Sequence, residues 1–363
     1  MHTIQVALNL NSYPIYIGNN ILTSQEILVS HIHGHQVLIV TQKNIGHLYL
    51  KSIEKNLAGY QYDVLLLADG EQYKNVAEWQ TIFTELLQKN HDRSTTLIAL
   101  GGGVVGDITG FAAACYQRGV NYIQIPTTLV AQVDSAIGGK TGINHFLAKN
   151  MLGAFYQPQC VIADIDTLRT LPSRAYIAGL AEVIKYALIC DAEFFSWLEK
   201  NSHLVVAKKP EALLHIITTC AAHKAAIVAE DERDQGGRRE LLNFGHTFGH
   251  ALEAMGAYQA VLHGEAVAIG MMMAAEISTF VNGLSAKDVE RIRCLLTVCG
   301  LPVHLPKQLQ PIELIALMKR DKKNKNGKIK LILLEAVGRA NSQDSISEEG
   351  LVALMEKVRS NFL

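Results

Sequence analysis

The first half of the chain alternates two kinds of residue pattern, and this alternation constrains the fold more than any other feature. Short runs rich in aliphatic and β-branched residues are separated by longer stretches of helical periodicity up to about residue 165. The clearest β-rich runs are Val37–Val40, Val64–Leu67, Thr96–Leu100, Tyr122–Ile125 and Val161–Ala163. Strands that alternate with helices are typical of a parallel sheet with crossover helices. The sequence therefore predicts an α/β domain with a Rossmann-like parallel sheet over residues 1–168.

After about residue 170 the β-rich runs nearly disappear. Helical periodicity dominates the stretches 175–190, 211–229, 241–256 and 264–281. A chain of 363 residues is longer than one typical hydrophobic core supports. We therefore expect a second, mostly α-helical domain over residues 169–363. Within it, the turn-forming segment Lys325-Asn326-Gly327-Lys328 predicts a hairpin and a small β-ribbon.

The composition indicates a soluble globular protein, with 49% hydrophobic residues and a formal net charge of −1. The basic run from Lys319 to Lys330 could be a solvated ribbon or a polyanion patch, but this net charge argues against nucleic acid. We find no secretory signal, and Glu276 interrupts the Met-rich helical stretch. The six cysteines contain no CxxC and predict reduced thiols. We expect a cytoplasmic protein that binds neither membranes nor nucleic acid.

Side chains that ligate metals are embedded in apolar helical sequence in the second half. In a predicted helix over Leu241–Glu253, Asn243, His246 and His250 are spaced i, i+3 and i+7, so they line one helix face. Two histidines four residues apart on a helix can point at one ion. Such pairs also occur as hydrogen-bonded structural residues.

Two further residues strengthen the metal interpretation. His263 stands just before a long apolar helical stretch, and Glu182 lies within another, where an unpaired carboxylate would be strongly disfavoured. An ion pair with Lys185, three residues on, is the alternative partner for that carboxylate. Two histidines and one carboxylate with an open fourth position are typical of a catalytic zinc site. We interpret Glu182, His246 and His263 as metal ligands and leave His250 for proton transfer.

Glycine-rich segments follow the predicted strands of the first half. Gly101, Gly103 and Gly106 form a GxGxxG pattern, in which backbone amides and a helix N-terminus can approach a pyrophosphate. The acidic residue expected about 20 positions later is missing. The cluster Asp69–Lys74, after the preceding strand, could supply that acid or be a solvated turn. The segment Asp134–Asn144 repeats the glycine theme with a lysine suited to a phosphate or carboxylate.

Together these motifs cover essentially the whole chain. They are Asp69–Lys74, Gly101–Asp107, Gln124–Thr128, Asp134–Lys140, Ala181–Lys185, Asn243–His250 and His263–Glu265. In this order they resemble the 3-dehydroquinate synthase family, within the wider group of sugar phosphate cyclases. The resemblance implies an NAD-binding domain joined to a helical metal-binding domain, usually in a homodimer, with the substrate in the cleft between the domains.

The resemblance also implies a reaction. The family converts 3-deoxy-D-arabino-heptulosonate 7-phosphate to 3-dehydroquinate and phosphate, and it regenerates NAD in every turnover. Oxidation of the C5 hydroxyl acidifies the neighbouring C6 proton, so phosphate can leave by β-elimination. Re-reduction, ring opening and an aldol closure follow. Zinc or cobalt lowers the cost of the alkoxide that gives up hydride.

The resemblance assigns site residues as follows. Glu182, His246 and His263 are the metal ligands, and His250 is the proton carrier. The side chains that hold the substrate's phosphate and carboxylate are Lys140, Asn150, Arg118, Lys224, Arg239, Asn243, Lys322 and Lys323. The NAD contacts are Asp69, Gly70, Glu71, Gln72, Tyr73, Lys74, Gly103, Val104, Val105, Gly106, Asp107, Thr127, Thr128, Lys140, Lys149, Thr167, Leu168, Arg169 and Thr170.

Several of these assignments have alternatives at the level of sequence. Arg118 and Lys224 could be ordinary surface or ion-paired charges. The segment before Arg239 is one residue longer than the family pattern, so either Arg238 or Arg239 could point inward. The Thr167–Thr170 turn could equally be a helix entry.

Three other functions compete with this reading. A cyclase of the 2-deoxy-scyllo-inosose or valiolone type would share the metal set, but Lys149-Asn150, Arg239 and Asn243 suit an acidic heptulosonate. A metal-dependent alcohol dehydrogenase of the glycerol dehydrogenase kind would produce net NADH. A metal-stabilised binding protein without catalysis would have no need for His250 or Lys140.

Overall fold

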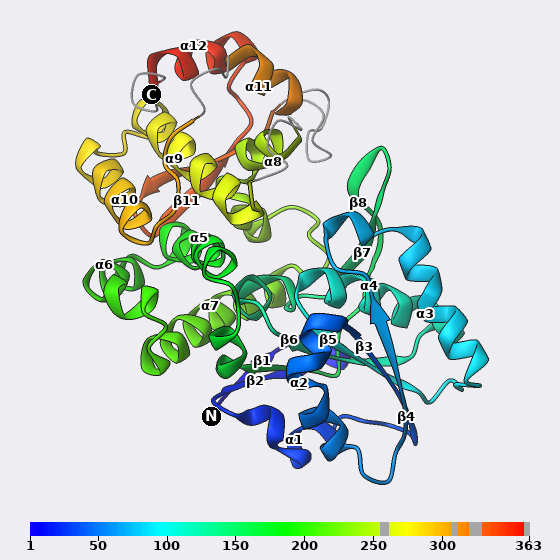
Figure 1. The fold of residues 1–363 in the computed structure, drawn as a ribbon. Coiled ribbons are helices and arrows are strands. Elements are labelled where there is room, and N and C mark those ends of the chain that lie inside the picture. Colours follow the sequence, from blue (N-terminus) through cyan, green and yellow to red (C-terminus); the bar gives the residue numbers. More distant parts are fainter. Residues whose placement is uncertain (255–260, 306–310, 319–328, 359–363) are drawn as a thin grey trace. The chain divides into compact units, whose positions relative to one another are not determined.

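The computed structural model describes residues 1–254, 261–305, 311–318 and 329–358 (Figure 1). The chain forms two compact units, of which the first contains Met1–Leu171 and Leu213–Arg233 and the second Pro172–Ala212 and Asp234–Leu363. The chain passes between these units three times, after Leu171, Ala212 and Arg233. The reason is that α7 (Pro210–Glu230) is anchored in the first unit, where Lys224 forms an ion pair with Asp134.

The first unit is built on a seven-stranded sheet in the order β1-β2-β9-β6-β5-β3-β4. Its strands are β1 (His2–Val6), β2 (Tyr13–Gly18), β3 (Gln36–Gln42), β4 (Gln61–Leu67), β5 (Thr96–Gly101), β6 (Asn121–Pro126) and β9 (Cys160–Asp164). Only β1 pairs antiparallel, with β2; the other pairs are parallel. The five β-rich runs and the parallel sheet predicted from the sequence are confirmed, whereas β1 and β2 were not predicted.

Helices cover both faces of this sheet. They are α1 (Gln25–Val29), α2 (Lys43–Asn56), α3 (Val76–Gln88) and α4 (Gly103–Cys115), and most of α7 also belongs to this unit. Successive side chains of β3 point to opposite faces. Leu38 therefore lies in one hydrophobic cluster with Ile108 of α4, and Ile39 in another with Ile53 of α2. A strand buried on both faces requires the near-continuous apolar sequence seen here.

The strand order reverses between β3 and β5. The chain runs from β3 outward to β4, then crosses back to β5 and continues through β6 to β9. In open α/β sheets, ligands bind outside the carboxyl ends of the strands at such a reversal. Gly101–Gly103 follow β5 at this point, so the topology places the glycine-rich loop where a nucleotide is expected.

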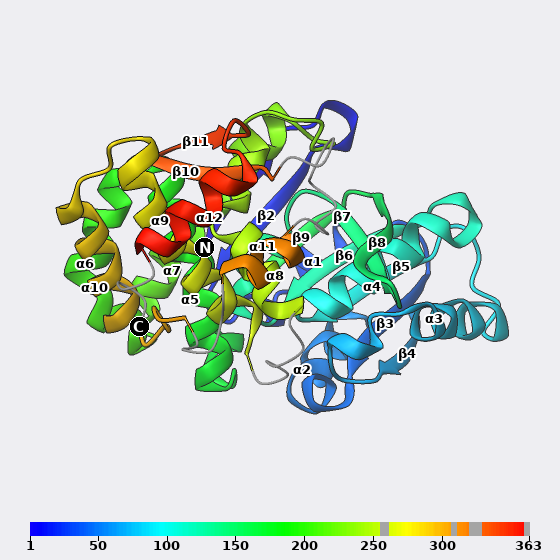
Figure 2. The same cartoon turned by 90° about the horizontal axis from the view of Figure 1, so that it is seen from above.

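A separate hairpin, formed by β7 (Lys140–His145) and β8 (Ala148–Phe155), belongs to the first unit and was not predicted. Both views show it beside α4 (Figures 1 and 2), against which β7 packs. The close approach is visible at Gly110, where an added Cβ would lie 2.5 Å from the Thr141 methyl group.

The second unit is mostly helical, as predicted. Its helices are α5 (Ser173–Cys190), α6 (Ala192–Val206), α8 (His246–Ala254), α9 (His263–Val281), α10 (Ala286–Val298), α11 (Pro311–Met318) and α12 (Glu348–Val358). A two-stranded ribbon of β10 (Leu331–Ala336) and β11 (Arg339–Gln343) is also present. Its turn lies at Val337 and Gly338, while the predicted turn Lys325–Lys328 lies outside the described residues.

The prediction of one continuous helix over 241–256 is wrong. A short 3-10 helix, Arg238–Asn243, ends before α8 begins at His246. The break lies at Gly245, whose φ of 77° is left-handed and favours glycine. A Cβ there would lie 2.9 Å from the Val267 carbonyl oxygen of α9. Asn243 therefore does not share a helix face with His246 and His250.

Two helices, α7 and α9, are long and apolar enough to cross a membrane by length and composition alone. Within the apolar 18-residue stretch of each helix, 56% of the residues of α7 and 78% of those of α9 are buried. Such burial is typical of the core helices of soluble proteins. Their apolar character is thus explained by packing within the fold.

Candidate metal centre and nucleotide-binding edge

Three helices of the second unit bring Glu182, His246 and His263 together. Glu182 lies in the middle of α5, while His246 and His263 are the first residues of α8 and α9. Both Nε2 atoms approach the same carboxylate oxygen, Oε1 of Glu182, at 3.4 Å for His246 and 3.5 Å for His263. Ligand atoms about 2.1 Å from a tetrahedral zinc ion lie about 3.4 Å from each other. The spacing of this donor set therefore fits a divalent metal ion.

Neighbouring groups orient two of these ligands. The Nδ1 atom of His246 lies 3.1 Å from the Phe244 carbonyl oxygen, which fixes the ring so that Nε2 faces the cluster. Lys185 contacts the other carboxylate oxygen of Glu182, Oε2. The ion pair with Lys185 forms, and it leaves Oε1 of Glu182 turned toward the histidines, so it does not conflict with the predicted role of Glu182 as a ligand.

Burial and charge act in opposite directions on these groups. Burial alone would raise the pKa of Glu182, but Lys185 and the histidines hold that pKa well below its usual range. Burial lowers the pKa of His246 to about 4. Burial would also lower the pKa of His263, but the carboxylates of Glu182 and Glu253 raise it to about 10. His246 is thus held in the neutral form that ligates metals.

His250 lies next to this cluster. Its ring centroid is 5.5 Å from that of His246 and 6.2 Å from that of His263. A second group of donors, His250, Glu253 and His263, is also compact enough for an ion. We favour the group around Glu182, because its carboxylate is 2% exposed and a buried charge needs compensation. In that arrangement His250 lies beside the ligand group, and its role in proton transfer stays a prediction.

The predicted nucleotide contacts of the first unit gather at one edge of its sheet. Asp69–Lys74 follow β4, Gly103–Asp107 follow β5, Thr127 and Thr128 follow β6, and Thr167–Thr170 follow β9. The carboxyl ends of parallel strands meet at the same edge, so these loops are neighbours. The Thr167–Thr170 segment is largely a 3-10 turn, Ile165–Arg169, capped by the Asp164 side chain.

The glycine-rich loop leaves room for a ligand at the start of α4. Gly102 is the N-cap residue of α4. Because glycine has no side chain, Gly102 offers no side-chain acceptor to the first amides of the helix. A Cβ on Gly103 would lie 3.0 Å from Ser135 Oγ, and one on Gly102 would lie 3.0 Å from the Thr128 methyl group. Glycine keeps this space open. A helix N-terminus of this kind binds phosphate groups.

Two buried hydroxyl groups at this edge have no hydrogen-bond partner within the part of the chain that the structure describes. They are Thr127 Oγ1 and Ser135 Oγ. A buried polar atom without a partner costs about 1–3 kcal/mol. With the uncapped helix N-terminus, these hydroxyls fit the hydrogen-bonding groups of a dinucleotide, so the residues present fit NAD.

The predicted substrate-binding side chains lie in both units. Lys140 and Asn150 are on the β7–β8 hairpin, and Lys149 precedes Asn150. Lys224 is nearly buried and forms an ion pair with Asp134, while its role in substrate binding stays a prediction.

In the second unit, Arg239 is 1% exposed and Arg238 is exposed, so Arg239 is the arginine that points inward. The Asn243 amide donates to the Glu240 carbonyl oxygen at 2.9 Å. The structure does not bring Arg118 to the nucleotide edge, since it is exposed between α4 and the start of β6. Lys322 and Lys323 lie outside the described residues.

Several neighbours of the predicted site residues were not predicted from the sequence. Lys185 was considered only as a rival partner of Glu182, and Asp134 was not connected with Lys224. Glu253 was not considered as a partner of His263, to whose Nδ1 atom its carboxylate lies 3.6 Å away. The available signal was the same in each case, a charged side chain with largely apolar neighbours in the sequence.

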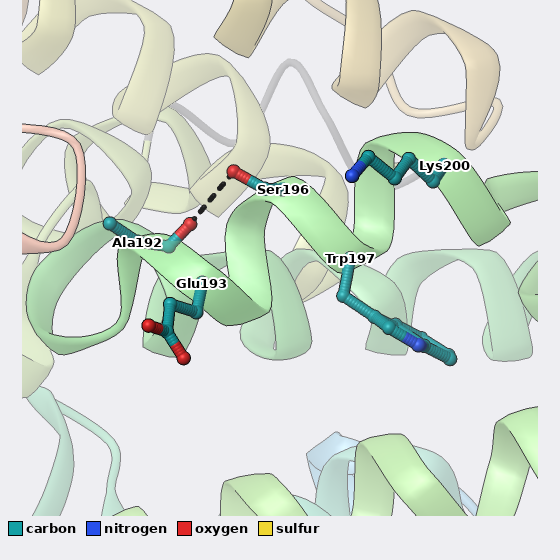
Figure 3. Close-up of a pocket in the computed structure, with 5 residues that line it drawn as sticks. All are labelled: Ala192, Glu193, Ser196, Trp197 and Lys200. Carbon is teal, nitrogen blue, oxygen red and sulfur yellow. Dashed lines mark hydrogen bonds between the residues drawn. The ribbon is translucent and has the colours of Figure 1, made fainter.

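A shallow depression of about 490 Å³ lies along α6 (Figure 3). It is lined by Ala192, Glu193, Ser196, Trp197 and Lys200. The hydroxyl of Ser196 donates to the Ala192 carbonyl oxygen at 3.0 Å within the helix. The lining contains none of the predicted site residues, so we assign it no part in the chemistry.

Comparison with known proteins gives a consistent result. Models of the 3-dehydroquinate synthase N-terminal and C-terminal regions match residues 64–178 and 179–324. A 3-dehydroquinate synthase of Nitrosococcus oceani is 52% identical over 357 residues, which cover 98% of this chain and 99% of that protein.

Two solved structures are also similar. One is 2-epi-5-epi-valiolone synthase from Streptomyces hygroscopicus with NAD+ and Zn2+ bound, with a TM-score of 0.88 and 28% identity over 98% of this chain and 99% of that one. The other is 2-deoxy-scyllo-inosose synthase complexed with carbaglucose-6-phosphate, NAD+ and Co2+, with a TM-score of 0.86 and 26% identity over 100% of both chains. The family models and the relative at 52% identity establish that the chain belongs to the 3-dehydroquinate synthase family.

Proposed function

We propose that this chain converts 3-deoxy-D-arabino-heptulosonate 7-phosphate to 3-dehydroquinate and phosphate, with NAD and a divalent metal ion. This reaction belongs to the shikimate pathway of aromatic amino acid biosynthesis. One observation carries the proposal, namely the approach of His246 and His263 to one oxygen of Glu182 at metal-ligand spacing. The 52% identity to a 3-dehydroquinate synthase over nearly the full length of both chains supports this reaction over those of other cyclases.

Glu182, His246 and His263 would hold zinc or cobalt. When bound, the ion supplies a Lewis acid for the hydroxyl to be oxidised, and NAD supplies a reversible hydride acceptor. Lys185 keeps Glu182 ionised, and the Phe244 carbonyl group fixes the ring of His246. These two neighbours orient the ligands before the ion arrives.

The carboxyl edge of the sheet would hold NAD. The first amides of α4, at Gly103 and Val104, bind the pyrophosphate, and the hydroxyls of Thr127 and Ser135 find partners on the dinucleotide. The Asp69–Lys74 segment binds ribose hydroxyls. NAD is not consumed overall, so the site must retain it through the whole sequence of steps.

His250 would move the proton of the hydroxyl that is oxidised. Its ring adjoins both metal-binding histidines, and histidine exchanges protons near neutral pH. Beta-elimination of phosphate and the aldol closure need the substrate to be held in a fixed orientation, which its charged groups make possible.

Cationic and amide side chains would hold those charged groups. The substrate carries a phosphate and a carboxylate, both of which are bound best by lysine and arginine. The side chains proposed for this are Lys140, Asn150, Arg118, Lys224, Arg239, Asn243, Lys322 and Lys323. Arg239 is buried, and its guanidinium group is of the kind that binds a carboxylate or phosphate through paired hydrogen bonds.

We further propose that the protein is a cytoplasmic homodimer. Arg118 is exposed between α4 and β6, away from the nucleotide edge of its own chain. This position is compatible with a contribution to the site of the other chain in the dimer.

The test is phosphate release from 3-deoxy-D-arabino-heptulosonate 7-phosphate with catalytic NAD and zinc, while absorbance at 340 nm is followed. Phosphate release without net NADH supports the proposal. Net NADH from a simple polyol, without phosphate release, would assign a dehydrogenase activity instead. Turnover of a sugar phosphate without a carboxylate in preference to the acidic substrate would assign one of the other cyclase reactions.

A further inference from the structure

Asn144 lies at an irregularity in the β7–β8 hairpin. Ile143 pairs with Leu152 and His145 pairs with Ala148, so the register shifts between these two pairs. On this register Asn144 alone faces three residues of β8, numbers 149–151. A bulge of this kind releases backbone groups from the ladder and turns a side chain in a new direction. Asn144 can therefore form hydrogen bonds outside the β7–β8 ladder.

Asn144 makes three hydrogen bonds that join two separate segments. Its backbone N–H donates to the Lys74 carbonyl oxygen at 2.7 Å. Its side-chain Nδ2 donates to Glu71 Oε1 at 2.8 Å, and its Oδ1 accepts from the backbone N–H of Asn150 at 2.8 Å. A carboxylate on one side and an N–H on the other fix the orientation of the amide. Asn144 thus connects the loop after β4 with both strands of the hairpin.

Asn150 completes the connection from the other strand. Its φ of 53° is left-handed, a conformation that asparagine tolerates better than most residues. Its side-chain Oδ1 accepts from Lys74 Nζ at 2.5 Å. Lys74 is 5% exposed and also donates to Asp107 of α4 at 2.5 Å. Asn150 is therefore tied through its backbone to Asn144 and through its side chain to Lys74.

The tip of the hairpin is exposed. A two-stranded hairpin is marginally stable by itself in water. Phe146 is 89% exposed and Leu147 is 77% exposed, so neither side chain packs against the body of the first unit. Hydrogen bonds with Asn144 and Lys74 help to hold Asn150 in place, and Lys74 belongs to the loop that is proposed to hold NAD.

We propose that Asn144 is a positioning residue that couples the nucleotide loop Asp69–Lys74 to the substrate-binding residue Asn150. The identity of the two ligands rests on the proposed function. NAD bound on the loop then orders Asn150 through Glu71, Asn144 and Lys74, and loss of the Asn144 side chain weakens both binding steps.

The first test compares Asn144→Ala with Leu147→Ala, a matched truncation at the exposed tip of the same hairpin. NAD affinity is measured by titration calorimetry, and amide exchange at residues 149–151 is measured with and without NAD. Loss of a hydrogen bond to a charged group corresponds to roughly a tenfold change in affinity. We expect Asn144→Ala to weaken NAD binding by about that factor and to remove the NAD-dependent protection of residues 149–151. Leu147→Ala keeps both.

The second test reverses the polarity of one hydrogen bond. Asn144→Asp keeps an acceptor for the Asn150 N–H but places a carboxylate against Glu71. Adding Glu71→Gln supplies a donor from the opposite side, so the double variant should bind NAD about as well as Glu71→Gln alone. Glu71 is itself a proposed NAD contact, and the comparison therefore uses the complete double-mutant cycle.

A purely structural role predicts a different pattern, namely a lower melting temperature with unchanged NAD affinity and an unchanged KM for the sugar phosphate. That pattern, or additive effects in the cycle, would overturn the proposal. Calorimetry and exchange need no sugar phosphate, so the two proposals fail separately. If the unmodified chain binds NAD and protects residues 149–151 but releases no phosphate, only the proposed function fails; if it does not bind NAD, both fail.

Discussion

Lys185 contacts the carboxylate of Glu182 from one helical turn away on α5, and both side chains are almost completely buried, at 1% and 2% exposure. Removing one partner of a buried ion pair leaves an uncompensated charge and costs about 3–5 kcal/mol. The same carboxylate also faces the two histidines. Its charge can therefore be compensated either by the lysine or by a bound metal ion.

The first prediction concerns this shared carboxylate. Lys185→Met should lower the free energy of unfolding of the metal-free protein by about 3 kcal/mol. Zinc should recover part of this loss, because it compensates Glu182. The measurement is denaturant unfolding with chelator and with zinc. Lys200→Met, the same change on the exposed surface of α6, is the control and should shift neither curve. Equal losses with and without zinc would contradict compensation by the ion.

The second prediction separates a metal ligand from a proton carrier. His263→Ala should abolish activity and reduce zinc content to near zero while the helical circular dichroism is kept. His250→Ala should keep the zinc and lower kcat by roughly 10²–10⁴-fold, the usual contribution of general acid–base catalysis. Zinc content is measured by elemental analysis after gel filtration. Full activity with full zinc content in His263→Ala would refute its role as a ligand.

Much of the fold follows from local sequence patterns. The five central strands are predictable because a strand buried on both faces must be almost continuously apolar, as Val37–Val40 is. The grouping of Glu182, His246 and His263 is predictable because each would be costly to bury alone. In both cases the deciding free energy is the cost of burial, which depends on a single residue or a single strand.

Other features depend on contacts that the sequence does not display. The helix predicted over 241–256 breaks at Gly245, because that residue packs against the backbone of α9. The hairpin β7–β8 was missed because its turn is Phe146-Leu147, which contains none of the glycine, asparagine or aspartate residues that mark a two-residue hairpin turn. The choice between Arg238 and Arg239 required the structure, since only burial distinguishes two adjacent arginines.

The third prediction concerns the space kept open by glycine at the nucleotide edge. Gly103→Ala should weaken NAD binding by roughly tenfold or more, because the added methyl group would lie 3.0 Å from Ser135 Oγ and narrow the approach to the first amides of α4. Titration calorimetry with NAD measures the effect. Gly350→Ala on α12 is the matched control, since it adds the same methyl group to a helix of the second unit. Unchanged NAD affinity in Gly103→Ala would show that the ligand does not approach here.

The last prediction links helix packing to the metal centre. Gly264 follows His263 at the start of α9, and a Cβ there would lie 1.8 Å from the Ala178 carbonyl oxygen of α5. No side-chain rotation relieves a clash with backbone, so Gly264→Ala must push α9 away from α5. That movement separates His263 on α9 from Glu182 on α5, whose nearest atoms are 3.5 Å apart.

We therefore expect Gly264→Ala to lower the free energy of unfolding by about 1–3 kcal/mol, as overpacking does, and to weaken zinc binding by roughly 10–100-fold, as displacement of an oriented ligand does. Competition with a chromophoric chelator measures the affinity, and denaturant unfolding with chelator measures the stability. Gly350→Ala again serves as the control. A variant that loses stability but keeps its zinc affinity would show that His263 and Glu182 keep their spacing when α9 moves. The contact between Gly264 and Ala178 would then not set that spacing.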